Sequence, residues 1–193
     1  MNKQRQSKNG LLVLISSPSG GGKNTVIKSL LKYFVHATQL VTTTTRKKRV
    51  GEQDGTDYHF INREEFETKL KNGDFVEYNE YSGSLYGTQW EDLTNAVSNH
   101  EIVLSQADVH GKKNLDKQGV PHLSIFLLPE NLDVLKHRIT QRGGVSNEDM
   151  QKRLEAAEHE IETSKIYDYQ ITNEQDNMEQ TINMIKGIIK KNL

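Results

Sequence analysis

The chain has 193 residues, with 25 Lys and Arg, 26 Asp and Glu and a formal net charge of -1. A chain of this length buries about 70% of its unfolded surface, which suits a single domain with a substantial core. The balanced charge argues against a protein whose main task is to coat nucleic acid or an anionic membrane, because such proteins depend on an excess of basic residues. The absence of cysteine excludes disulfides, thiolate metal sites and a thiol nucleophile.

Residues 1–10 are predicted to form a polar tail, because they carry three cations and no apolar stretch. The longest apolar run after them, Leu11 to Ile15, is far too short to span a membrane. We therefore expect a cytoplasmic protein that binds no membrane.

Strand and helix patterns alternate along the chain. The apolar run Leu11 to Ile15 ends in turn residues and predicts a buried parallel strand, which is followed by a predicted helix over 24–34. A β-branched run is predicted at 39–45, a charged loop at 46–57, a helix with the capping pair Asn62 and Glu65 at 62–71, and a largely antiparallel β region at 74–88. Further strands are predicted at 101–108, 122–128 and 167–172, with helices at 131–141, 147–165 and 176–191. This order favours an α/β fold with a parallel sheet, into which a β-rich segment is inserted.

Residues 17–25 form a glycine-rich loop between the first predicted strand and helix. They resemble the phosphate-binding pattern G-x-x-x-x-G-K-[ST], although Ser17 replaces the first glycine and Asn24 replaces the hydroxyl residue. In such a loop, backbone amides curl around a β-phosphate at a helix N-terminus, and Lys23 bridges the β- and γ-phosphates. The candidate phosphate-binding residues are Ser17, Ser19, Gly20, Gly21, Gly22, Lys23, Asn24 and Thr25.

Asn24 affects the metal that accompanies a bound nucleotide. The hydroxyl usually found at this position is a ligand of Mg²⁺. We therefore expect either the amide oxygen of Asn24 or the hydroxyl of Thr25 to take that place.

The arginines form two groups in a chain whose cations are mostly lysine. Arg46 and Arg49 lie beside hydroxyl residues and a tyrosine, and Arg138, Arg142 and Arg153 surround a glycine-containing segment between two predicted helices. The planar fork of arginine matches a phosphate, so each group is a candidate anion site. In isolation, the segment 42–60 is equally compatible with a solvated basic loop.

Several motifs follow the glycine loop in a fixed order. They are Thr-Thr-Arg-x-x-Arg-x-Gly-Glu-x-Asp-Gly-x-Asp-Tyr-x-Phe at 44–60, Gly-Asp-Phe-Val-Glu at 73–77, Leu-Tyr-Gly-Thr at 85–88, Asp-Val-His-Gly at 108–111, and Arg138 through Arg142-Gly143. With this order, the chain resembles the guanylate kinases of bacterial type from about residue 10 to residue 190.

The resemblance implies transfer of the γ-phosphoryl group of ATP to GMP, and to dGMP, with Mg²⁺ as cofactor. It implies a P-loop NTPase core over about 11–41 and 95–193, a GMP-binding insert over about 42–90 and a helical lid over about 138–153, all within one domain, 11–193. The implied partners are the small molecules ATP and GMP, without nucleic acid, and the protein is expected to be a monomer or a homodimer.

The resemblance also assigns roles to residues. The GMP phosphate is assigned to Thr42, Arg46, Arg49, Tyr58 and Tyr86, and the guanine base to Glu77, Thr88 and Asp108. The catalytic residues are Lys23, Arg46, Arg138, Arg142 and Arg153, of which the last three belong to the lid; Arg138 and Arg142 also bind ATP. Asn173 is assigned to the adenine side of the ATP site, although an Asn that caps the next turn fits the sequence equally well.

Two positions depart from the family pattern, and two other functions remain open. Asn24 lacks the usual hydroxyl, and Gln106 stands where the family usually has an acid. One alternative is a non-catalytic module of this type that binds GMP or a protein, against which the retained Lys23 argues. The other is a related P-loop kinase that acts on a sugar phosphate, against which Glu77 and Asp108 argue.

Overall fold

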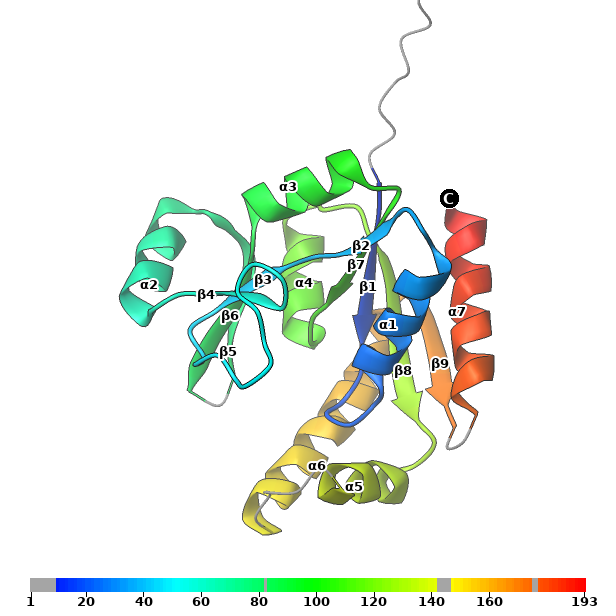
Figure 1. Ribbon diagram of the computed structural model, residues 1–193. Helices are drawn as coiled ribbons and strands as arrows, with labels where there is room; N and C mark the ends of the chain where they lie inside the picture. Colours follow the sequence, from blue (N-terminus) through cyan, green and yellow to red (C-terminus); the bar gives the residue numbers. More distant parts are fainter. Residues whose placement is uncertain (1–9, 82, 142–146, 175–176) are drawn as a thin grey trace, which may run out of the picture.

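The computed structural model describes residues 10–81, 83–141, 147–174 and 177–193 (Figure 1). Its main sheet is wholly parallel and has the strand order β2-β7-β1-β8-β9. The strands are β1 (Leu11–Ser16), β2 (Ala37–Gln39), β7 (Ile102–Gln106), β8 (Leu123–Pro129) and β9 (Tyr169–Asn173). In the described part of the chain, no helix combines the length and apolar character needed to cross a bilayer. The α/β fold with a parallel sheet, expected from the sequence, is confirmed.

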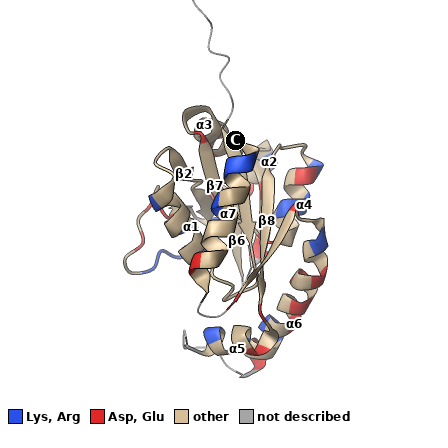
Figure 2. Ribbon diagram, turned by 90° about the vertical axis from the view of Figure 1, so that its right-hand side faces the viewer, with Lys and Arg blue, Asp and Glu red and all other residues tan. Residues whose placement is uncertain are grey.

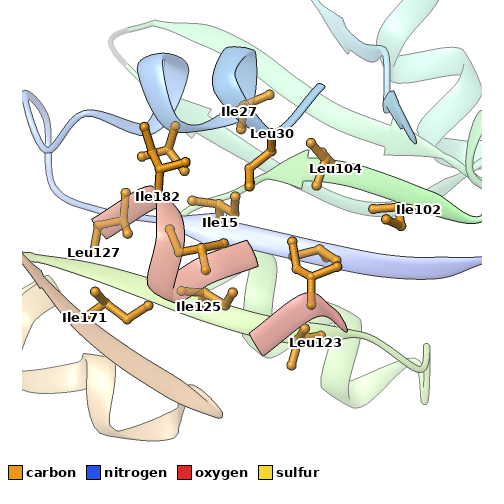
Figure 3. Close-up of a cluster of buried hydrophobic side chains, with 14 residues drawn as sticks. Ile15, Ile27, Leu30, Ile102, Leu104, Leu123, Ile125, Leu127, Ile171 and Ile182 are labelled. Atoms are coloured by element: carbon orange, nitrogen blue, oxygen red, sulfur yellow. The ribbon is translucent and has the colours of Figure 1, made fainter. Parts of the chain in front are cut away.

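Helices cover both faces of this sheet, which explains the continuous apolar run of β1. Val13 and Ile15 pack on one face against α1 (Lys23–Tyr33) and α7 (Met178–Asn192), and Figure 3 shows Ile15 beside Ile27, Leu30 and Ile182. Leu12 and Leu14 point to the other face, into a cluster with residues of α3 (Trp90–Asn99), α4 (Val109–Lys117) and α6 (Asn147–Thr163). Alternate side chains of one strand are therefore buried on opposite faces.

A second sheet lies beside the carboxyl-terminal edge of the first and has the order β4-β3-β6-β5 (Figure 1). Its strands are β3 (Thr42–Thr44), β4 (Tyr58–Phe60), β5 (Phe75–Tyr81) and β6 (Ser84–Gln89). β5 and β6 pair antiparallel, as predicted, whereas β3 and β4 pair parallel. The helix α2 (Arg63–Asn72) closes this unit by stacking Phe66 on Phe75, with 4.2 Å between ring centroids. The Asn62 side chain accepts a hydrogen bond from the Glu65 amide, which confirms the predicted cap.

Two further helices pack together below the main sheet in Figure 1. They are α5 (Leu132–Gln141) and α6, joined through Leu135, Ile139 and Ala157. A 3₁₀ turn (Ser164–Ile166) leads from α6 towards β9. Residues 142–146, including Arg142 of the predicted lid, lie outside the described residues.

The structure differs from the sequence-based elements in two places. The run predicted at 39–45 is divided, because Leu40 is buried in the main core and bonded to Leu104, whereas Thr43 and Thr44 pair with β6 in the second sheet. The helices α3 and α4 were not predicted at all. α4 contains Gly111, which lowers helix propensity and hides the pattern of Val109 and Leu115.

Candidate active site

A cavity of about 320 Å³ opens where the carboxyl ends of β1 and β7 meet the second sheet. Crevices at this edge of an open α/β sheet are the usual places for ligands. The cavity is lined by Ser17, Ser19, Lys23, Thr42, Tyr58, Glu77, Asn79, Tyr86, Gly87, Gln106, Ala107, Asp108 and Glu160. The cavity therefore brings together residues predicted to bind ATP, the phosphoryl donor, and residues predicted to bind GMP, the acceptor, although the two sets are far apart in sequence.

The glycine loop leaves β1 and curls back on itself before α1. Gly20 and Gly22 have left-handed backbone angles (φ +89° and +94°), and the Gly21 amide bonds the Pro18 carbonyl at 3.0 Å. Gly22 caps α1 without a side-chain bond, and the first turn of α1 carries no acidic residue. The amides and the positive end of the α1 dipole thus remain suited to an anion.

Lys23 folds back over this loop. Its ammonium donates to the carbonyl of Ser17, to the Ser17 hydroxyl at 3.0 Å and to the Pro18 carbonyl at 3.5 Å. The charge is thereby held at the mouth of the loop, in the cavity wall.

Asn173 ties the end of β9 to the same loop. Its amide nitrogen donates to the Gly21 carbonyl at 3.0 Å, and its oxygen accepts from the Thr181 hydroxyl at 3.2 Å. The residue is fully buried. Both ends of the amide are engaged by protein, so the structure shows a contact with the loop backbone, and the assignment to adenine stays a prediction.

Arg46 lies with two tyrosines on the acceptor side. Its guanidinium is 2.7 Å from a carboxylate oxygen of Glu52 and lies over the Tyr58 ring, 5.5 Å from the centroid. The hydrogen bond to Glu52 is the largest cause that raises the pKa of Arg46, and Tyr86 adds to it. The rings of Tyr58 and Tyr86 meet edge to face at 6.1 Å. Thr42, paired with Tyr58 across β3 and β4, completes this wall.

Arg49 is placed differently. Its side chain is exposed on the loop between β3 and β4, while its backbone amide donates to Glu52 at 2.7 Å. The Glu52 carboxylate therefore accepts from both arginines, from the guanidinium of Arg46 and from the backbone amide of Arg49.

Glu77 and Asp108 are two of the three carboxylates that line the cavity, and Glu160 is the third. The buried hydroxyl of Thr88 donates to Glu77 at 2.7 Å. Burial raises the pKa of Glu77, the bond from Thr88 opposes that rise, and the charge of Asp108 adds to it. Asp108 is the N-cap of α4, because one of its oxygens accepts from the Gly111 amide at 2.9 Å. Thr88 thus acts on the site by holding Glu77.

A family model described as guanylate kinase matches residues 9–192. The chain belongs to the guanylate kinase family. Its relatives include the guanylate kinases of Clostridium perfringens (strain SM101 / Type A) and Clostridioides difficile (strain 630). The first is 35% identical over 98% of this chain and 87% of the relative, and the second is 38% identical over 94% and 88%.

A crystal structure of guanylate kinase from Anaplasma phagocytophilum has the same fold. It superposes with a TM-score of 0.76 at 31% identity, covering 96% of this chain and 87% of that chain. The resemblance found in the sequence motifs is therefore confirmed over nearly the whole chain.

Two of the three arginines assigned to the lid, Arg138 and Arg153, lie on α5 and α6. Arg138 is partly buried on α5, beside the glycine loop, because a Cβ added at Gly20 would lie 3.8 Å from the Arg138 Cβ. Arg153 is partly exposed on α6 and is not in the cavity wall. Arg142 lies outside the described residues, so the structure does not place it.

The metal-side residues are at the start of α1 and the end of β7. Asn24 and Thr25 are exposed in the first turn of α1, and Gln106 lines the cavity. In the described ranges, no three His, Asp or Glu side chains gather in a way that would hold a metal ion.

Sequence reasoning missed two polar side chains of the cavity wall, those of Asn79 and Glu160. Glu160 lies on α6, along which Figure 2 shows acidic residues in red. The other acidic residues of α6 in the described range are exposed. Burial raises the pKa of Glu160 to about 7, against the attraction of Lys23, and the charge of Asp108 adds to the rise. Its spacing of three and four residues from the buried Ala157 and Ser164 was an available signal. For Asn79 the signal was its position two residues after Glu77 on a strand.

Proposed function

We propose that this cavity is the place where the γ-phosphoryl group of ATP passes to GMP, giving ADP and GDP. The observation that carries the proposal is that Lys23 of the glycine loop and Tyr58, Tyr86 and Glu77 of the second sheet line one cavity. Two anion sites that open into one space allow two nucleotides to meet at their phosphates. Holding them there supplies most of what phosphoryl transfer needs.

The donor phosphates bind at the glycine loop. Amides of residues 19–22 and the start of α1 surround the β-phosphate. Lys23 exchanges the carbonyl oxygens of Ser17 and Pro18 for phosphate oxygens, because bonds between two charged groups are the stronger ones. Asn173 supports this binding by holding the Gly21 carbonyl in place.

The acceptor phosphate binds at Arg46, Tyr58, Tyr86 and Thr42. Glu52 orients the Arg46 guanidinium, and the tyrosine hydroxyls supply further donors. Arg49 reaches the same phosphate from its exposed loop. This set holds a phosphate monoester close to the γ-phosphate site.

The base binds at Glu77, Thr88 and Asp108. A carboxylate accepts from the N1–H and the amino group of guanine, whereas adenine has no proton on N1. Thr88 keeps one Glu77 oxygen fixed. With adenine, the partly buried Glu77 carboxylate would lose the donors that guanine supplies, and this loss disfavours adenine.

The transfer itself requires no protein nucleophile. An oxygen of the GMP phosphate attacks the γ-phosphorus in line, and the γ-phosphoryl bond to ADP breaks. Lys23, Arg46 and the arginines at 138, 142 and 153 offset the charge that spreads over the transferred group. Residues 138–153, as a lid, exclude water, which otherwise accepts the phosphoryl group.

The donor set of this site fits Mg²⁺. Asn24, Thr25 and Gln106 offer neutral oxygens, and Mg²⁺ takes most of its ligands from substrate phosphates and water. When bound, the ion neutralises charge on the β- and γ-phosphates. Asn24 or Thr25 would hold it in place of the usual hydroxyl.

A coupled assay across GMP, dGMP, AMP and sugar phosphates, each with and without Mg²⁺, tests the proposal. We expect ADP formation with GMP and dGMP, little with AMP or sugar phosphates, and dependence on Mg²⁺. The Lys23→Met variant should lose more than about a hundredfold in kcat. Absence of GDP above background would refute the catalytic role, and GMP binding by calorimetry without turnover would support the non-catalytic module instead.

A further inference from the structure

Asn79 lies beside the carboxylates assigned to the guanine base, although no role was assigned to it. It is two residues after Glu77 on β5, so both side chains leave the strand on one face. Both line the cavity, and Asn79 is partly buried there. A polar side chain with this placement either contacts the ligand or shapes the groups that do.

The hydrogen bonds of Asn79 indicate the second role. Its amide nitrogen donates to Asp108 Oδ2, while Asp108 Oδ1 accepts from the Gly111 amide at 2.9 Å. An ionised carboxylate only accepts, so the nitrogen of the Asn79 amide must be the end that faces Asp108. The Asp108 carboxylate is thus held on one side by the start of α4 and on the other by β5.

The hydrogen bond from Asn79 to Asp108 matters because the cavity holds neighbouring acidic side chains. Asp108 lies close enough to Glu77 that its charge acts on the Glu77 carboxyl, so the two acids repel each other. Asn79 contributes a donor to Asp108 without adding charge. A carboxylate at this position would add a fourth acid to Glu77, Asp108 and Glu160 in the cavity wall. An apolar side chain would leave Asp108 Oδ2 without this partner.

We infer that Asn79 is a positioning residue for the site that binds the guanine base. By fixing the Asp108 carboxylate, Asn79 sets where the wall accepts hydrogen bonds from the base, and so tunes the affinity for GMP. The inference rests on the proposed function, in which Glu77 and Asp108 bind the base. It concerns binding of the acceptor nucleotide and leaves the phosphoryl-transfer step to other residues.

The test measures kcat and the KM values for GMP and ATP in Asn79→Ala, Asp108→Ala and the double variant. Loss of a hydrogen bond to a charged group predicts a KM for GMP about 10- to 30-fold higher in Asn79→Ala, while kcat and the KM for ATP change less than about twofold. If Asn79 acts through Asp108, Asn79→Ala has no further effect once Asp108 is replaced by alanine. Asn95→Ala, at an exposed asparagine on α3, is the control and should match the unmodified chain.

Thermal unfolding and calorimetric GMP binding on each variant separate a folding defect from a binding defect. Fully additive effects of the two substitutions, or an unchanged KM for GMP in Asn79→Ala, would overturn the inference. An increased KM in Asn79→Ala with an unchanged KM in Asp108→Ala would show that Asn79 acts without Asp108, which also overturns it. Failure of the proposed function is a different result, namely no GDP from the unmodified chain.

Discussion

The amide nitrogen of Asn173 donates a 3.0 Å hydrogen bond to the carbonyl of Gly21, across 152 positions of sequence. The bond joins the end of the last strand of the main sheet to the loop that receives the donor phosphates. The same amide accepts from Thr181 in α7, so its orientation is fixed by two elements. The shape of the phosphate loop therefore depends on the C-terminal part of the chain.

Substitution of Asn173 should weaken both the fold and the donor site. In Asn173→Ala, the Gly21 carbonyl and the Thr181 hydroxyl lose their shared partner in a buried place, which costs about 1–3 kcal/mol of unfolding free energy. We expect a melting temperature lower by several degrees and a higher KM for ATP, with a smaller effect on the KM for GMP. Thermal unfolding and steady-state kinetics measure both.

The exposed Asn183 on α7 provides the control for that experiment. Asn183→Ala should leave the melting temperature and both KM values close to those of the unmodified chain. An Asn173→Ala variant with unchanged stability and unchanged KM for ATP would contradict the supporting role of this residue.

Glu77→Gln should separate activity from stability. The amide retains the shape of the side chain but can present a donor where the guanine base also donates, so kcat/KM for GMP should fall about a hundredfold. Because burial and Asp108 raise the pKa of Glu77, the ionised carboxylate opposes folding, and its removal should not lower the melting temperature at pH 8. Kinetics with GMP and thermal unfolding at pH 8 check the two expectations. Unchanged GMP kinetics would argue against the role of Glu77 in base selection.

The parts of this site that could be predicted from sequence are those built from consecutive residues. β1, the glycine loop and α1 are adjacent in the chain, and their apolar run, glycines and lysine each have a local physical reason. The motif order then indicated the family, and with it the residues of the acceptor side.

The parts that were missed depend on contacts between distant segments. The run at 39–45 divides between two sheets because Leu40 is buried in the main core, whereas Thr43 pairs with β6. Glu160 is one of several acids on α6 and resembles a solvated residue until the packing of α6 brings it to the cavity. The role of Asn79 depends on its hydrogen bond to Asp108, which is 29 positions away in the sequence. Spacing within one element does not reveal such neighbours.

Gly111→Ala should increase the helix propensity of α4 but disturb the geometry of the site that binds the base. In a helix interior, Ala is normally more stable than Gly by about 1 kcal/mol. At this position a Cβ would lie 2.6 Å from the Ala107 Cβ and 3.2 Å from Glu77 Oε2, so the start of α4 or Glu77 must shift. We expect a KM for GMP increased by at least about fivefold, without the usual gain in melting temperature.

Gly187 offers the matched substitution on another helix. It lies in α7, and a Cβ added there meets nothing within 4 Å. Gly187→Ala should raise the melting temperature by a few degrees and leave the kinetics unchanged. Equal gains in stability at both glycines, with unchanged GMP kinetics, would show that α4 and Glu77 accommodate the extra methyl group.

Glu160→Gln should change how the stability of the protein depends on pH. Burial raises the pKa of Glu160 from 4.5 to about 7. Between these values the folded chain retains a proton that the unfolded chain has released, so the unmodified protein loses stability as pH rises through this window. The amide of the variant cannot titrate, which removes this loss. We expect the variant to melt roughly 2–6 °C above the unmodified chain at pH 8, and at the same temperature near pH 4.

The direction in which the melting temperature of Glu160→Gln changes at pH 8 shows whether burial or Lys23 has the larger effect on Glu160. The charge of Lys23 lowers the pKa of Glu160, and the burial of the carboxyl raises it. If the attraction to Lys23 prevailed, removing the negative charge would destabilise the protein at pH 8, and Glu160→Gln would melt below the unmodified chain. Glu158→Gln, which removes an exposed carboxylate from the same helix, controls for the change in net charge. Melting curves of the three proteins from pH 4 to pH 8 therefore decide whether burial or the lysine dominates at Glu160.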